Sequence, residues 1–299
     1  MTRQMTRLLG LFTLLALAAV ARAEIRVVDD LGHELTLDRP ATRVVSLAPN
    51  ITESLFAVGA GGLIVATVNY SDYPEEALLI PQIGAFNRVN IESVVGYKPD
   101  LVLATHSGNG GEVIERLRAL GLKVYAADPR RLEGIARNLS DFAALTGRGA
   151  EGAAAADRFS ARLGRLRATY AGAAPVTALY QVWNDPLTTV NDKHMIADLI
   201  RVCGGVNAFG EAIPLLPVIS VEAVLKADPQ VIIASGMGEE RPDWVDQWRR
   251  WPSLTAVRDN HLYFIPPSLL QRYSVRILDG AEQMCGFLQQ ARQTLEHRP

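Results

Sequence analysis

Residues 90–104 read NIESVVGYKPDLVLA, and residues 220–234 read SVEAVLKADPQVIIA. The two stretches match at a constant offset, with a glutamate (Glu92, Glu222) and a proline in the same places. A small polar residue opens each copy, where it can cap a helix, and the glutamate follows in the first turn, where the helix dipole favours negative charge. Because proline cannot continue a helix, each copy predicts a short helix that ends before it.

An uninterrupted aliphatic run closes each copy: LVLA at residues 101–104 and VIIA at residues 231–234. Such runs, without polar alternation, are typical of strands buried on both faces of a parallel sheet. Any α/β chain repeats helix–proline–strand units, but a match that holds over a whole unit favours a true internal repeat. A solenoid would need more copies at a shorter period. The sequence therefore predicts two related lobes.

The residues around the first copy also alternate between strand and helix patterns. A β-hairpin is expected over residues 24–38, and three strands and two helices follow. The expected strands are 43–49, 62–68 and 122–128, and the expected helices are 50–60 and 111–121. This β-α-β-α order indicates a parallel sheet covered by helices.

Residues 132–172 are rich in alanine and arginine and have no strand signals, which predicts helix with a break at Thr146-Gly147. A second sheet begins at residues 176–183, and a long helix over about 275–295 ends the chain. We therefore expect an α/β protein of two lobes with parallel sheets, joined by a long connecting helix, with a ligand cleft between the lobes. The expected domains are residues 24–131, a helical connector over 132–172, and residues 173–299.

The N-terminus has the pattern of a secretory signal peptide over residues 1–23. Arg3 and Arg7 precede the 14-residue apolar run Leu8–Ala21, and Ala21-Arg22-Ala23 is a small-x-small cleavage site. A membrane anchor is the alternative, but the run is shorter than the ~20 residues needed to span a bilayer. No later stretch is long and apolar enough to cross a membrane, so we expect an exported, soluble chain that begins at Glu24.

Composition argues against several classes of function. Export removes three of the 30 basic residues, which leaves 27 against 32 acidic residues and does not favour nucleic acid. The two cysteines, Cys203 and Cys285, suggest one disulfide in an oxidising compartment, with two buried thiols as the alternative. The five histidines are scattered without metal-ligand spacing, so no metal site is predicted.

Signals of catalysis are also weak. The glycines of SGNGGEV (107–113) do not form GxGxxG, and neither GxxxxGK[ST] nor GxSxG occurs. An exported enzyme remains the alternative class, but it would need a nucleophile with a base in reach, and no credible trio stands out. We assign no catalytic residue and no cofactor.

Several segments resemble the periplasmic binding proteins of ATP-driven importers for cobalamin, haem and iron-siderophores. The segments with this superfamily resemblance are 43–60, 70–74 (YSDYP) and 90–104. Those that look most like the cobalamin-binding proteins are 70–77, 201–209 and 271–285. The resemblance covers nearly all of the mature chain and implies two Rossmann-like lobes bridged by one long helix. It also implies a monomeric periplasmic protein that delivers a corrinoid to an ABC transporter permease–ATPase complex.

The resemblance also implies roles for individual residues. Tyr70 holds the place of a tyrosine that faces the corrin, and Arg272 that of an arginine that contacts the ligand. Three further positions are tryptophans of the cleft in the relative and differ here: Phe86, Thr105 and Leu216. Trp183 can compensate in part, since it follows the strand that opens the second lobe.

The same resemblance makes Glu92 and Glu222 the residues that dock on the permease, and it matches Cys203 with Cys285. Haem or an iron-siderophore is the alternative ligand. Phe86 lies near the place where haem-binding relatives have an iron-ligating tyrosine, and phenylalanine cannot ligate iron. Tyr70 or His106 could do so, which keeps haem open.

Overall fold

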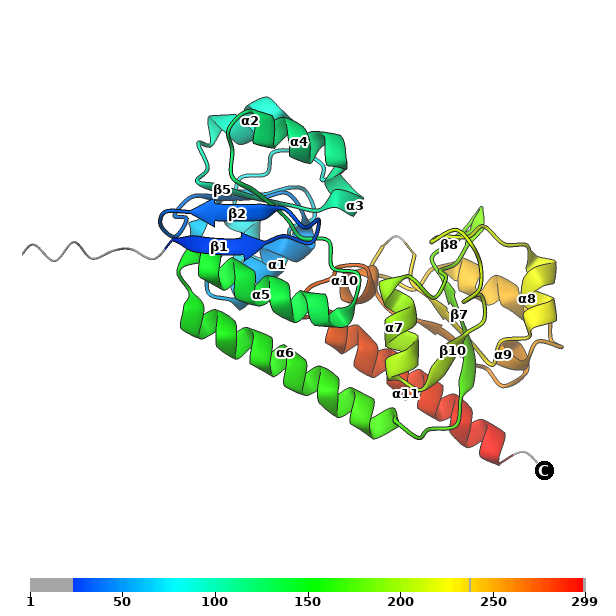
Figure 1. Ribbon diagram of the computed structural model, residues 1–299. Coiled ribbons are helices and arrows are strands. Elements are labelled where there is room, and N and C mark those ends of the chain that lie inside the picture. Colours follow the sequence, from blue (N-terminus) through cyan, green and yellow to red (C-terminus); the bar gives the residue numbers. More distant parts are fainter. Residues whose placement is uncertain (1–23, 237, 298–299) are drawn as a thin grey trace, which may run out of the picture.

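The computed structural model describes residues 24–236 and 238–297, and the predicted signal peptide lies outside them. Figure 1 shows two lobes, one at each end of a layer of long helices. Each lobe contains a four-stranded sheet in which every strand is parallel to its neighbours. The predicted α/β class with two lobes is therefore confirmed.

The N-terminal lobe begins with an antiparallel hairpin, β1 (Ile25–Val28) and β2 (Glu34–Leu37). Its parallel sheet has the strand order β4-β3-β5-β6. These strands are β3 (Val44–Ser46), β4 (Ile64–Ala66), β5 (Leu101–Ala104) and β6 (Val124–Ala126). The helices of this lobe are α1 (Pro49–Ala57), η1 (Gly61–Leu63), η2 (Glu75–Leu79), α2 (Ile91–Gly96), α3 (His106–Asn109) and α4 (Gly111–Ala119).

The C-terminal lobe has the strand order β10-β7-β11-β12. Its strands are β7 (Val176–Gln181), β10 (Gly205–Asn207), β11 (Val231–Ala234) and β12 (Leu262–Phe264), and β8 (Trp183–Asn184) and β9 (Leu187–Thr188) form a hairpin. Its helices are α7 (Met195–Val202), α8 (Val221–Ala227), η3 (Asp243–Arg250), α9 (Thr255–Arg258) and α10 (Pro267–Leu270). In each four-stranded sheet, the strand that comes first in the chain pairs with the second on one side and with the third on the other, and the fourth lies beyond the third.

The sequence repeat forms equivalent elements in the two lobes. Asn90 accepts a hydrogen bond from the backbone N–H of Ser93 at the start of α2, and Ser220 accepts one from Ala223 at the start of α8. The strands that follow, β5 and β11, are fully buried and hold the third place in their sheets. The helix caps and buried strands predicted from the repeat are thus confirmed.

The predicted helical connector consists of two helices, α5 (Leu132–Thr146) and α6 (Gly149–Tyr170). The break falls at Gly147, which ends α5 in the left-handed conformation with φ of 70°. α5 packs on α1 and β1 of the N-terminal lobe, whereas α6 runs from one lobe to the other below it (Figure 1). The terminal helix α11 (Ile277–Glu296) contacts α6 and reaches under the second lobe.

One hydrophobic core is continuous across both lobes on the side of the long helices. It includes Leu139 and Phe142 of α5, Phe159 of α6, and Ile200 and Leu288 in the second lobe. Each sheet has a separate core on its other face. A shared core resists separation of the lobes, because opening it would expose apolar surface to water.

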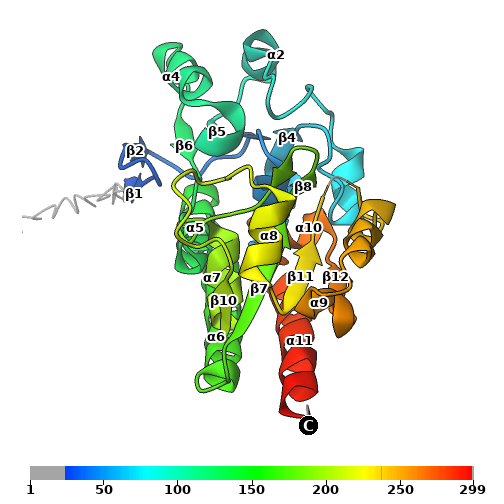
Figure 2. The ribbon, with the colours of Figure 1, turned by 90° about the vertical axis from the view of Figure 1, so that its right-hand side faces the viewer.

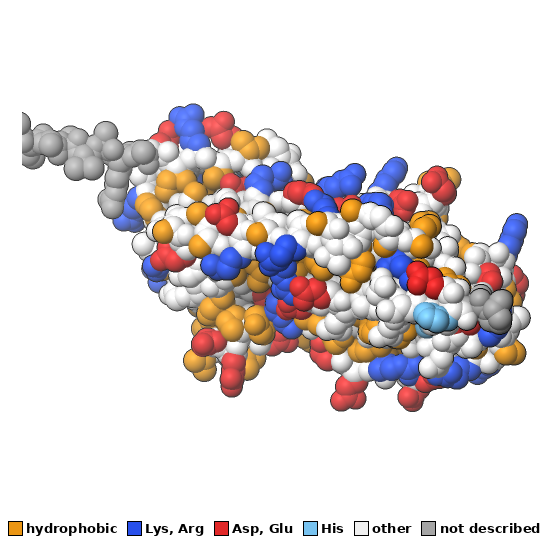
Figure 3. All heavy atoms as spheres, turned by 90° about the horizontal axis from the view of Figure 1, so that it is seen from below, with side chains coloured by type: hydrophobic (Ala, Val, Ile, Leu, Met, Phe, Trp, Pro, Cys, Tyr) orange, Lys and Arg blue, Asp and Glu red, His pale blue; other side chains and the backbone are white. Residues whose placement is uncertain are grey.

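The predicted disulfide is present and joins Cys203, directly after α7, to Cys285 in α11. Within the described ranges, no helix has both the length and the apolar character needed to cross a membrane. Figure 3 views the molecule from the side of the long helices and shows acidic and basic side chains interspersed over that face.

Candidate functional site

The candidate ligand residues all follow the carboxyl ends of parallel strands. Tyr70 comes after β4, Thr105 after β5 and Trp183 after β7, while the loops after β10 and β12 lead to Leu216 and Arg272. Ligands of parallel α/β sheets bind at these strand ends. The candidate residues of both lobes thus follow the carboxyl-terminal edge of their sheets.

A network of buried hydroxyl groups anchors the segment that carries Tyr70. Thr67 lies at the end of β4, and its Oγ1 is 2.8 Å from Ser71 Oγ and 2.7 Å from Thr52 Oγ1 of α1. Ser46 of β3 completes the network at 2.8 Å from Thr52. Because these hydroxyls are buried and bonded to one another, the segment has a fixed position on the N-terminal lobe.

Tyr70 projects from this anchored segment and is 68% exposed. Its backbone is left-handed, with φ of 66°, a conformation that few non-glycine residues adopt. Phe86 of the same lobe is also exposed, and its backbone carbonyl accepts a hydrogen bond from the side chain of Asn109 at 2.7 Å. The N-terminal lobe therefore has two solvent-exposed aromatic side chains among the candidate residues.

Thr105 is in a different environment from the other candidates. It is 7% exposed, and its Oγ1 accepts a hydrogen bond from the backbone N–H of Gly108 as the cap of α3. A Cβ on Gly108 would lie within 3.2 Å of the Phe86 ring, so α3 packs directly on that ring. Thr105 thus holds the short helix that supports Phe86, and His106 beside it is exposed.

The C-terminal lobe contributes an apolar surface of its own. Trp183 lies in β8, and its indole N–H donates to the carbonyl of Asp185 at 2.8 Å, which fixes the ring. Leu216 is exposed in the loop between β10 and α8, as are Ile213, Leu215 and Val218. Exposed apolar residues grouped in one loop are typical of a binding surface.

Arg272 lies at the junction of the lobes rather than free in solvent. It donates to Glu53 of α1 at 3.0 Å and to Asp72 of the Tyr70 segment at 2.5 and 3.2 Å. Burial raises the pKa of Glu53, although hydrogen bonds from Ser274 and Arg272 act in the opposite direction. Arg272 thereby brings together the loop that contains Tyr70 and the start of the terminal helix.

Sequence reasoning missed four residues of this junction. They are Glu53 and Asp72 of the N-terminal lobe and Ser274 and Arg276 of the C-terminal lobe. Asp72 lies inside the YSDYP segment, so its charge beside Tyr70 was the available signal. In the sequence, Glu53 looks like an ordinary polar residue of an amphipathic helix, so nothing there indicates its role.

Glu92 and Glu222 are exposed in the first turns of α2 and α8. Backbone and Ser220 hydrogen bonds lower the pKa of Glu222. Figure 2 shows α2 at the far end of the upper lobe and α8 on the outer surface of the lower one. Each glutamate therefore lies at the surface of its own lobe.

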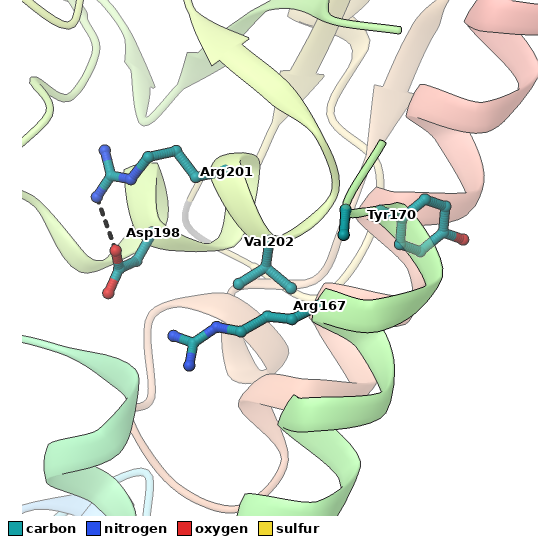
Figure 4. A pocket seen from close by; sticks show the side chains of 6 residues that line it. Arg167, Tyr170, Asp198, Arg201 and Val202 are labelled. Carbon is teal, nitrogen blue, oxygen red and sulfur yellow. Dashed lines mark hydrogen bonds and ion pairs between the residues drawn. The ribbon is translucent and has the colours of Figure 1, made fainter. Parts of the chain in front are cut away.

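A pocket of about 300 Å³ lies elsewhere, between α6 and α7 (Figure 4). Its charged groups are already paired, because Arg201 binds Asp198 at 2.7 Å and Arg167 binds Glu133 at 2.5 Å. None of the candidate ligand residues lines it. Among the residues that the structure describes, no three histidine, cysteine or acidic side chains are grouped so as to hold a metal ion.

Comparisons of sequence agree with this arrangement. The profile of the family named "Periplasmic binding protein" matches residues 44–269. The "Vitamin B12-binding protein" of Vibrio cholerae is 35% identical over 250 residues, which is 83% of this chain and 90% of that protein. The protein of the same name from Yersinia pestis is 32% identical over 278 residues, which is 93% of this chain and 94% of that one.

Comparisons of structure give the same result. The crystal structure of the periplasmic vitamin B12-binding protein BtuF of Vibrio cholerae superposes with a TM-score of 0.78 at 34% identity, over 84% of this chain and 98% of that one. The periplasmic haem-binding protein RhuT from Roseiflexus has a TM-score of 0.74 at 24% identity, over 84% and 99%, which shows a shared fold. On the profile match and these identities, the chain belongs to the periplasmic binding protein family.

Proposed function

We propose that the protein captures a corrinoid in the periplasm and delivers it unchanged to the permease of an ABC transporter. The observation that carries this proposal is the 35% identity to a vitamin B12-binding protein across 83% of the chain. A match of that length includes residues of both lobes.

The chemistry of the junction suits a large flat ligand. Tyr70 and Phe86 on one lobe and Trp183 and Leu216 on the other are exposed apolar surfaces, and a planar macrocycle gains from aromatic contacts. Arg272 can donate to a ligand that takes the place of Asp72 on its guanidinium group, and amide side chains at the edge of a corrin are suitable acceptors. The lobes of residues 24–131 and 173–299 would then form the two walls of the cleft.

Delivery requires recognition of a partner, for which Glu92 and Glu222 are the candidates. A monomer with one exposed glutamate on each lobe suits a two-fold permease that presents arginines on both subunits. The N-terminal 23 residues would be removed on export, so the protein that meets the permease starts at Glu24. Binding needs no resident cofactor, and no residue is assigned a catalytic role.

A binding titration tests the proposal. Purified protein lacking residues 1–23 is titrated in a calorimeter with cyanocobalamin, cobinamide, haemin and a ferric siderophore. We expect submicromolar affinity for the corrinoids, which corresponds to more than about 8 kcal/mol. The released ligand should have an unchanged mass and absorption spectrum. Tight binding of haemin with no heat from either corrinoid would move the assignment to haem, and a modified ligand would indicate an enzyme.

A further inference from the structure

Five side chains, one of which is Arg272, form hydrogen bonds that join the two lobes. Glu53 Oε1 accepts hydrogen bonds from Arg272 at 3.0 Å and from Arg276 at 3.3 Å, and its Oε2 accepts one from Ser274 at 2.5 Å. Asp72 accepts two from Arg272, at 2.5 and 3.2 Å. Both carboxylates belong to the N-terminal lobe, and their three partners belong to the segment before α11.

The two carboxylates differ sharply in their access to solvent. The side chain of Glu53 is 1% exposed, whereas that of Asp72 is 48% exposed. A ligand that approaches from solvent can replace Asp72 on the guanidinium, but it cannot reach Glu53. Arg272 thus has one partner that is buried and one that solvent can reach.

We propose that Glu53 and Asp72 control Arg272 in opposite ways: Glu53 positions it for the ligand, and Asp72 occupies its ligand-facing N–H groups until the ligand displaces it. The inference rests on the proposed function, since it takes Arg272 as a ligand contact. It assigns Glu53 as a positioning residue and Asp72 as a residue that competes with the ligand.

The charges explain why Glu53 is needed for position. Arg272 and Arg276 meet at a single carboxylate oxygen, so without that charge two guanidinium groups would face each other in a partly buried space. Ser274 lies between them in the chain and holds the second oxygen. Arg276 also lies over the ring of Tyr73, 4.0 Å from its centroid, which ties the same segment to the YSDYP loop.

The geometry of Asp72 explains the opposite effect. Its two bonds to the fork of Arg272 are charge-assisted and therefore strong, and a neutral amide acceptor must break them to take the same donors. Removal of the Asp72 charge lowers that cost without disturbing Glu53. Ligand affinity should then rise rather than fall.

The experiment compares Asp72→Asn, Glu53→Gln, Arg272→Ala and Asp72→Asn/Arg272→Ala with the wild type by titration with cyanocobalamin. Glu75→Gln is the matched control, because Glu75 is an exposed acid at the start of η2, three residues after Asp72, whereas Arg272 binds Glu53 and Asp72. We expect Asp72→Asn to tighten binding about fivefold and Glu53→Gln to weaken it about tenfold. The gain from Asp72→Asn should vanish in the Arg272→Ala background, which a purely structural role would not produce.

Each outcome decides a separate point. No binding by the wild type overturns the proposed function. If the wild type binds and Asp72→Asn weakens binding as Arg272→Ala does, the competing role is wrong. Wild-type affinity in Glu53→Gln overturns the positioning role.

If Glu53→Gln does not fold, Ser274→Ala is measured in its place. Ser274→Ala removes the hydrogen bond to only one oxygen of Glu53, and we expect about threefold weaker binding. Unchanged affinity in Ser274→Ala would count against the positioning role.

Discussion

Lys98 and Asp228 occupy the same place in the two copies of the repeat, and both have a left-handed backbone. Their φ angles are 47° and 41°, and each residue follows the short helix of its copy. For residues other than glycine this conformation costs about 1–2 kcal/mol. The repeat is therefore preserved in the backbone even where the side chains differ.

The first prediction compares glycine at these two positions. Lys98→Gly should stabilise the protein by up to about 1 kcal/mol, because glycine adopts a positive φ without a steric cost. Asp228→Gly should destabilise it, because the Asp228 carboxylate accepts hydrogen bonds from the N–H and hydroxyl of Thr255 at 2.7 and 2.9 Å. Urea unfolding measures both. Lys98→Ala removes the same side chain but keeps the conformational cost, so an equal gain in Lys98→Ala would contradict the explanation.

The repeat could be predicted because its elements depend on local sequence. Caps such as Asn90 and buried runs such as 101–104 act within a few residues, and their positions match α2 and β5 closely. The Glu53–Arg272 junction could not be predicted, because its two residues are 219 positions apart. Only the packing of both lobes on a shared layer of helices brings them together.

The environment of His194 also could not be predicted from the sequence. Its side chain caps α7 by accepting from the N–H of Ile196, and its Nε2 lies 3.4 Å from the hydroxyl of Tyr273. Burial lowers the pKa of His194 to about 4. Nothing in the sequence around position 194 distinguishes this partly buried cap from an exposed histidine.

The second prediction concerns acid stability. The lowered pKa means that the unfolded chain binds a proton at His194 before the folded chain does. The contribution of neutral His194 should therefore be present above about pH 6.5 and be lost as the pH falls towards about 4. In His194→Asn, which keeps a capping side chain, the stability should fall less over this range.

Thermal melts from pH 7 to pH 4 provide the measurement, and His33→Asn is the matched control because His33 is exposed. An identical pH dependence in wild type and His194→Asn would rule out this group as the cause.

The third prediction concerns the Cys203–Cys285 disulfide, which closes a sequence separation of 82 and joins the end of α7 to α11. The double change Cys203→Ala with Cys285→Ala should lower the free energy of unfolding by about 2–4 kcal/mol. Ligand affinity should be retained, since both cysteines are fully buried and neither is a candidate ligand residue. Thiol counting on the denatured, unreduced wild type should give no free thiol, and two free thiols would disprove the bond.

The fourth prediction tests the aromatic contacts. Tyr70→Ala and Trp183→Ala should each weaken cyanocobalamin binding about tenfold, as expected when an aromatic face is lost from a large apolar ligand. Both residues are exposed in the empty protein, so its melting temperature should change little. Leu120→Ala is the control, because Leu120 is exposed just before β6, at the opposite edge of the sheet. Unfolding of either variant with affinity retained would make that residue structural.

The fifth prediction concerns Glu92 and Glu222. A docking role must be separated from a simpler one, because stabilisation of its own helix is enough to explain the presence of each glutamate. A glutamate in the first turn of a helix stabilises it by about 0.3–1 kcal/mol whether or not a partner exists. That role explains each glutamate separately, but it does not require an exposed pair at equivalent places in two lobes. A two-fold permease with arginines on both subunits would engage such a pair symmetrically.

Glu92→Ala with Glu222→Ala should therefore abolish stimulation of the transporter ATPase and ligand uptake, while cyanocobalamin affinity stays within about twofold of wild type. The assay uses the cognate permease in vesicles, with pull-down and uptake as readouts. Glu112→Ala with Glu296→Ala is the matched control, since it removes one exposed glutamate from each lobe and Glu112 also lies in the first turn of a helix. The control should support normal uptake. If the Glu92 and Glu222 double variant also does so, the glutamates serve only their helices, and the permease must recognise another surface, of which the exposed loop from Ile213 to Val218 is the next to test.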